Sequence, residues 1–241
     1  METLSSPTFG KETPPCYVAL SLFHEMALFV AAIRLHGDIT MQLTDYLERS
    51  SRDHSHLCPR QILGVRMGLC GLKALGVSAN QGSKRLLVIT ETDGCFADGL
   101  TAATDCSVGH RTLRVEDYGK AAATFVDTHT GLAIRVAPAL DIRERAYQYA
   151  PNEPRHYFAQ MQAYQTMPDD VMFNVNEVHL ATSITEIVSR PKVRINCDVC
   201  GEEIMNEREI REKGQVLCKG CSANAYYQLP VSMPIFDKIN A

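Results

Sequence analysis

The sequence predicts an α+β core domain, with helices packed on a mainly antiparallel sheet, followed by a small four-cysteine zinc-ribbon domain. Three observations lead to this prediction. A long apolar run with helical spacing starts at Pro59, and short β-type runs separated by turn residues fill the middle of the chain. Two Cys-x-x-Cys pairs stand near the C-terminus.

The composition indicates a soluble globular protein. Of the 241 residues, 45% are hydrophobic and 22% are charged, and the formal net charge of −4 argues against nucleic-acid binding, which requires a basic face. The apolar segment Tyr17–Leu35 is interrupted by His24 and Glu25, and its longest clean run, Met26–Ile33, is too short to span a membrane. The N-terminus lacks the features of a signal peptide. With nine cysteines and no secretion signal, we expect the protein in the reducing cytoplasm.

The N-terminal part of the chain is predicted to contain two helices after a polar tail. We expect residues 1–15 to form a flexible tail. Tyr17–His36 has the pattern of a helix that stops at Gly37, and Met41–Asp53 has the pattern of a second helix.

The clearest helix is Pro59–Leu75. Proline suits the first helical position, Cys58 is the expected N-cap, and Gly76 ends the apolar run. A sulfur at the N-cap lies at the positive end of the helix dipole, which favours the reactive thiolate. The alternative is an ordinary helix start with a buried structural cysteine.

The middle of the chain has a β-type pattern. Lys84–Glu91 contains an apolar run that suits a strand covered on both faces, and Ala97–Ala103 suggests a short helix or a tight crossing. Short strands joined by tight loops indicate an antiparallel meander rather than a βαβ repeat. The strands expected in this meander are Thr112–Glu116, Ala122–Asp127 and Leu132–Ala137.

The end of the core domain is predicted to be helical and then extended. The expected helices are Asp141–Tyr149 and Glu153–Met167, and Val175–Ala181 and Ile184–Val188 are expected to be strands or an extended arm. Ser189–Lys192 marks the boundary between the core domain, residues 16–190, and the ribbon domain with its C-terminal tail, residues 191–241.

The two Cys-x-x-Cys pairs predict a structural zinc site. Cys197, Cys200, Cys218 and Cys221 supply four soft ligands in two closely spaced pairs, which suit tetrahedral Zn²⁺. Because the protein fills all four positions, we expect this zinc to be structural and not catalytic.

A second site is predicted in the core domain. His56, Cys58 and Cys95 would give a zinc or iron ion three protein ligands and leave a fourth position open, as in catalytic metal sites. Without metal, Cys58 beside His54 or His56 could act as a nucleophile, so Cys58 and His56 are the candidate catalytic residues.

Several further polar residues lie near these motifs in the sequence. His54, Arg60, Asp98 and Cys106 are candidates for supporting positions around the core site, although packing or buried polar roles are favoured for Asp98 and Cys106. The same holds for His110. Cys16 and Cys70 have no partner signature and are expected in the core.

Four successive motifs resemble those of the FmdE family, the E component of formylmethanofuran dehydrogenase. The match runs from about Thr40 to Val136, and Ser55 and Arg60 stand where the family usually has glycine. Arg60 thereby brings a cation to the mouth of the predicted site. The matching motifs are His54-Ser55-His56-Leu57-Cys58-Pro59 with Gly64, Asp93-Gly94-Cys95-x-x-Asp98, Cys106-Ser107-x-Gly109 and Asp117-Tyr118-Gly119-Lys120-Ala121.

The resemblance implies a dimerising α+β core with a cleft lined by the His and Cys motifs, often containing a metal, and a terminal zinc ribbon as in some members. It also implies an association with a molybdenum or tungsten pterin enzyme. We therefore predict a homodimeric metal-binding protein, an accessory or enzyme-like component of one-carbon or molybdopterin-linked metabolism. The alternative is a non-catalytic scaffold or metal-delivery adaptor that docks through the ribbon.

Overall fold

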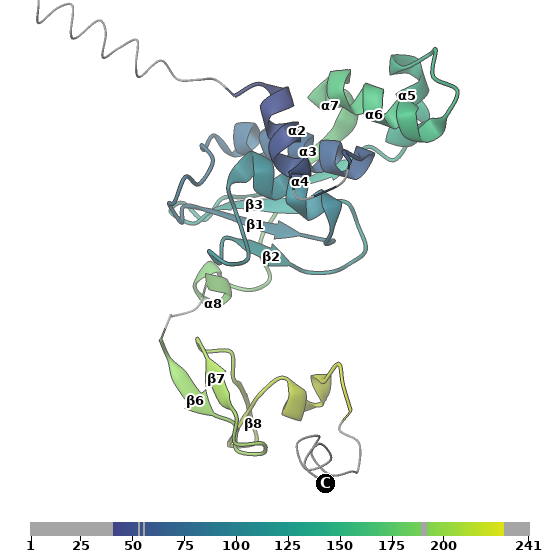
Figure 1. Cartoon of the computed structure of the whole chain (residues 1–241). Coiled ribbons are helices and arrows are strands. Elements are labelled where there is room, and N and C mark those ends of the chain that lie inside the picture. The colour runs from purple at the N-terminus through teal and green to yellow at the C-terminus, as the bar shows by residue number, and fades with distance from the viewer. Residues whose placement is uncertain (1–40, 53, 55, 189–191, 229–241) are drawn as a thin grey trace, which may run out of the picture. The chain divides into compact units, whose positions relative to one another are not determined.

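A five-stranded sheet forms the centre of the core, with helices α2, α3 and α4 on one face (Figure 1). The structure is a computed structural model that describes residues 41–52, 54, 56–188 and 192–228. The helix predicted at Tyr17–His36, the tail of residues 1–15 and Cys16 lie outside the described residues, as do residues 189–191 of the predicted boundary. The predicted α+β class with a mainly antiparallel sheet is confirmed.

The long helices follow the local sequence signals. Cys58 caps α3 at its predicted start, and Gly76 ends it with a φ of 69°, in the left-handed region that glycine tolerates. Within the described ranges, no helix is long and apolar enough to cross a membrane. The helices of the core are α2 (Leu43–Ser51), α3 (Pro59–Leu75), α4 (Cys95–Thr104), α5 (Ile142–Tyr149), α6 (His156–Thr166), α7 (Asp169–Met172) and α8 (Ile184–Val188).

The strands occur at the predicted places, but their order in the sheet differs from the predicted meander. The order is β2-β1-β3-β4-β5, in which β1 pairs with β2 in parallel and all other pairs are antiparallel. The strands are β1 (Leu86–Thr90), β2 (Leu113–Val115), β3 (Ala123–Asp127), β4 (Ala133–Pro138) and β5 (Phe173–Glu177).

The meander prediction is wrong at its first step, because β1 lies between β2 and β3. Helix α4 connects β1 to the parallel strand β2, and this connection is the crossover that the sequence argument had excluded. The following segment does not form a hairpin. The backbone N–H groups of Tyr118 and Lys120 both donate to the carbonyl of Glu91, so the chain passes the end of β1 before it enters β3.

Both faces of the sheet are covered. On one face Val88, Phe125 and Ile134 lie side by side and pack into the main core with the helices. On the other face Leu87, Val126 and Ala133 pack against apolar side chains of residues 178–188. Neighbouring residues of a strand point to opposite faces of the sheet. Because both faces are covered, both sets of side chains are buried, and β1 and β3 are apolar almost throughout.

The prediction of an extended Ile184–Val188 segment is wrong, since these residues form α8. Ser183 Oγ accepts a hydrogen bond of 3.2 Å from the backbone N–H of Glu186, as an N-cap side chain does. Ile184, Ile187 and Val188 pack against the sheet. Their spacing is that of one helical face, but five residues are too few for the period to be read with certainty from sequence.

Helices α3 and α4 make an unusually close contact through small residues. A Cβ at Gly64 would lie 2.2 Å from the carbonyl oxygen of Phe96, and a Cβ at Gly99 would lie 2.4 Å from the carbonyl oxygen of Gln61. Further along, a Cβ at Gly68 would lie 2.6 Å from that of Ala103. The contacts follow the same order in both helices, because Gly64 lies against Phe96 and Gly68 lies against Ala103. Helices α3 and α4 are therefore parallel, and their N-termini lie at the same end.

The C-terminal segment forms two short hairpins around its own small apolar cluster of Cys197, Ile204 and Leu217. Lys213 and Gly214 connect β8 to β9. The elements are β6 (Arg194–Asn196), β7 (Glu203–Met205), β8 (Ile210–Glu212), β9 (Gln215–Leu217) and the single π-helical turn η1 (Gly220–Asn224).

The contact between α3 and α4 predicts that Gly99→Ala destabilises the protein. Alanine gains about 1 kcal/mol over glycine in helix propensity, but its Cβ would meet the backbone of Gln61 and Val65, which cannot move aside easily. We expect the free energy of unfolding in denaturant to fall by roughly 2 kcal/mol, within the range for overpacking. Gly109→Ala is the control, since no atom lies within 4 Å of its added Cβ. Equal stability of the two variants would contradict the proposed constraint.

Candidate functional site

Cys58 is held in place by a buried glutamine. The backbone of Cys58 is extended, with φ −129° and ψ 160°, and its N–H donates to Gln61 Oε1 over 2.9 Å. Gln61 Nε2 donates to the carbonyl of Ser50 over 2.9 Å, and the Gln61 side chain is fully buried. Gln61 therefore fixes the first turn of α3 to the end of α2.

Cys95 lies at the N-terminus of α4, one position further into its helix than Cys58. It is the first residue of that helix, and its N-cap Gly94 has φ 64° and ψ −150°, a combination that is essentially restricted to glycine. Because α3 and α4 are parallel and closely packed, the positive ends of both helix dipoles lie near the two cysteines.

The side chains of Cys58 and Cys95 lie close enough to affect each other's ionisation. Desolvation raises the pKa of Cys95, and its side-chain hydrogen bond with Cys58 raises it further. Desolvation raises the pKa of Tyr157 on α6, and the negative charges of both cysteines raise it further. Two of the three predicted core ligands, Cys58 and Cys95, therefore lie near one another, at the N-termini of α3 and α4.

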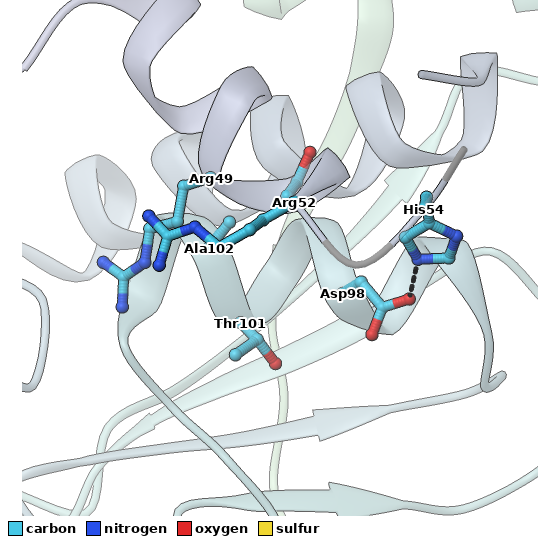
Figure 2. Close-up of a pocket in the computed structure, with 7 residues that line it drawn as sticks. Arg49, Arg52, His54, Asp98, Thr101 and Ala102 are labelled. Atoms are coloured by element: carbon cyan, nitrogen blue, oxygen red, sulfur yellow. Dashed lines mark hydrogen bonds and ion pairs between the residues drawn. The ribbon is translucent and has the colours of Figure 1, made fainter. Parts of the chain in front are cut away.

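The two histidines of the first motif have different surroundings. His54 Nε2 lies 2.9 Å from Asp98 Oδ2, and both side chains border a pocket of about 230 Å³, the His54 pocket (Figure 2). His56 is exposed. The ligand atoms of His56, Cys58 and Cys95 do not all lie within 4.8 Å of one another. Among the described residues, the four ribbon cysteines are the group of potential metal ligands whose ligand atoms all lie this close together.

The remaining candidates divide between a pocket and the core. Arg60 lines a second pocket, of about 200 Å³, which we call the Arg60 pocket. Cys106 lies beyond the C-terminal end of α4 and is fully buried, with its Sγ 3.3 Å from Asn80 Nδ2. Burial raises the pKa of both Cys106 and Cys70 to about 11. The fold does not bring Cys106 to the Cys58–Cys95 pair, and Cys70 packs in the core as expected.

The four ribbon cysteines converge. Their sulfur atoms all lie within 4.8 Å of one another, and the backbone N–H of Cys218 donates to Cys197 Sγ over 3.3 Å. Backbone N–H groups of Cys200 and Cys218 lower the pKa of Cys197 to about 6. Sharing hydrogen bonds with its neighbours raises the pKa of Cys221 to about 12. Four convergent sulfurs form a donor set that could hold a metal ion and that fits tetrahedral zinc.

Two residues of the core site were missed by the sequence argument. Gln61 carried a readable signal, because a polar side chain three residues after an N-cap is the pattern of a capping box. Tyr157 carried none, since it reaches the cysteines only through the packing of α6 against α3.

Comparison with known proteins gives related sequences and a related fold. Residues 54–174 match the model of a family described as "FmdE, Molybdenum formylmethanofuran dehydrogenase operon". A "Probable S-adenosyl-L-methionine-binding protein" of Archaeoglobus fulgidus is 36% identical over 98 residues, which cover 39% of this chain and 27% of that protein. The chain thus spans about a quarter of that curated relative.

The crystal structure of a tungsten formylmethanofuran dehydrogenase FmdE-like protein from Syntrophus aciditrophicus has a similar fold. The TM-score is 0.52 at 20% identity, and the match covers 79% of this chain and 97% of that one. At this identity the likeness shows the fold alone.

The hydrogen bonds of Gln61 predict that Gln61→Leu destabilises the protein and loosens Cys58. The variant leaves the Cys58 N–H and the Ser50 carbonyl without this buried partner, which costs about 1–3 kcal/mol. We expect that loss in denaturant unfolding and a changed alkylation rate at Cys58 in peptide mapping.

Gln165→Leu is the matched control. Its Nε2 donates to the carbonyl of Met161 one turn back on α6, at a partly exposed position. We expect a change within about 0.5 kcal/mol, as for surface substitutions. If the two leucine variants behave alike, Gln61 has no special role at the site.

Proposed function

Because the chain belongs to the FmdE family, we propose that it binds a metal in its core and serves one-carbon or molybdopterin-linked metabolism. The observation that supports the core site is the contact between Cys58 and Cys95 at the adjoining N-termini of α3 and α4. Two thiols in this environment are suited to act together as soft ligands for zinc or iron.

In this proposal, Cys58, Cys95 and His56 hold the metal, and a fourth position stays open for water or substrate. A metal held in this way polarises a carbonyl or lowers the pKa of bound water. Asp98 accepts a hydrogen bond from His54 or pairs with its protonated ring, and the histidine thereby remains beside the site. If no metal binds, the thiolate of Cys58 is the candidate nucleophile.

The ribbon has a separate role in the proposal. Its four cysteines are all used as ligands of a structural zinc, so we assign no chemistry to this metal. The family description names a molybdenum formylmethanofuran dehydrogenase operon, and we propose a pterin-bearing molybdenum or tungsten enzyme as the partner. Because the ribbon metal would have no open position for a substrate, the ribbon favours a second candidate function, that of a non-catalytic adaptor that docks through this segment.

Metal content of the full chain tests the core site. We expect about two metal ions per chain after reconstitution with zinc, and about one in Cys58→Ser and in Cys95→Ser, by elemental mass spectrometry of desalted protein. Cys200→Ser should also lose one ion, from the ribbon. Cys70→Ala is the control on α3, and it should keep both, because Cys70 packs in the core away from the pair.

An unchanged metal content in Cys58→Ser and Cys95→Ser, with normal circular dichroism, would contradict the core metal. In that case, capture of a component of the pterin enzyme by the wild-type chain without turnover of a small molecule would favour the adaptor.

We further propose that the protein is a cytoplasmic homodimer. Apolar side chains that are exposed on and beside α5 and α6, namely Leu140, Tyr147, Tyr157 and Phe158, offer contact area for a second copy. Sedimentation equilibrium should give twice the mass of one chain, and Leu140→Glu combined with Phe158→Glu should shift it toward the monomer. A wild-type monomer at all concentrations would exclude the dimer.

A further inference from the structure

The Arg60 pocket lies next to the Cys58–Cys95 pair. It is lined by residues of α3, α4, α5 and α6, and its volume of about 200 Å³ is smaller than the 300–1,000 Å³ typical of pockets for drug-sized ligands. Pro59 and Phe96 line it, and each directly follows one of the two cysteines. The cysteines themselves do not line the pocket, so a small molecule bound there would lie beside the pair.

The charged residues that line this pocket are both arginines. Arg60 comes from the first turn of α3 and Arg143 from the first turn of α5, and no carboxylate is among the lining residues that the structure describes. In the described part of the chain, neither guanidinium has an ion-pair partner. By contrast, Arg49, Arg66, Arg85, Arg135, Arg145 and Arg155 each pair with a carboxylate.

The other residues that line the pocket are uncharged, and they include both polar and apolar side chains. Thr92 and Gln160 can donate hydrogen bonds, and Phe96 and Tyr164 supply buried aromatic surface. Gln160 and Tyr164 lie four residues apart on one face of α6. A ligand anchored by the arginines would thus pack against this face of α6.

We propose that the Arg60 pocket binds a small oxyanion, whose carboxylate or phosphate group contacts Arg60 and Arg143 beside the helix N-termini that carry Cys58 and Cys95. The planar guanidinium fork matches the geometry of both oxyanions, and two such groups without a carboxylate partner among the described residues leave donors available for a ligand. The assignment rests on the proposed function, because it names the substrate class of the Cys58–Cys95 site.

Calorimetric titration of the full chain tests the pocket. Inorganic phosphate and acetate are titrated separately at constant ionic strength, with chloride as the balancing anion. We expect saturable binding of at least one of them, weakened roughly tenfold or more by Arg60→Gln and by Arg143→Gln, since each removes a charge-assisted contact. Preference for phosphate or for acetate identifies which oxyanion the pocket takes.

Arg145→Gln is the matched control. Arg145 lies on α5 two residues after Arg143, but it pairs with Asp141 and does not line the pocket. We expect binding within about twofold of wild type, because surface ion pairs contribute little. The pocket assignment fails if neither anion saturates, or if Arg145→Gln weakens binding as much as the two pocket variants.

The same samples separate this inference from the proposed function. Metal content and anion affinity are measured on wild type and on Cys58→Ser. Arginine-dependent anion binding in a chain whose core holds no metal would support the pocket and contradict the metal site. A core metal in a chain that binds neither anion would support the metal site and contradict the pocket.

Discussion

The close contact between α3 and α4 is the constraint on which the candidate site depends. Gly64 and Gly99 let the two helix backbones approach to a distance that any side chain would prevent. Because the helices are parallel, this approach also brings their N-termini together, and with them Cys58 and Cys95. The glycines lie further along the helices than the sulfurs, yet they determine whether the two thiols can act as one group.

The fold was predictable from sequence where local signals decide it. Proline at the first helical position and glycine after the last gave α3 its observed bounds, because both act through the backbone of single residues. The strand order was not predictable in this way. Insertion of β1 between β2 and β3 depends on contacts between distant segments, among them the hydrogen bonds from Tyr118 and Lys120 to Glu91.

The candidate site likewise contains residues that local sequence signals identify and residues that only the folded structure brings together. Cys58 was a candidate because its place at a helix N-terminus is readable from sequence, whereas the start of α4 at Cys95 is seen only in the fold. The position of Arg143 could not be found, since an arginine in a solvent-facing helix has no signature until the packing of α5 and α6 forms the pocket. His56 as a metal ligand remains a prediction, and its side chain does not complete a close three-ligand cluster with the two cysteines.

The surroundings of the cysteines also bear on which ligands can approach them. The chain carries a formal net charge of −4, which alone would disfavour anions. Around the cysteines, however, the positive ends of two helices adjoin a pocket with two arginines that no described carboxylate pairs with. A thiolate at this place would repel an anionic ligand, and these positive groups offset that repulsion over short distances. The local charges, rather than the net charge, therefore favour a small anion beside a sulfur-rich centre.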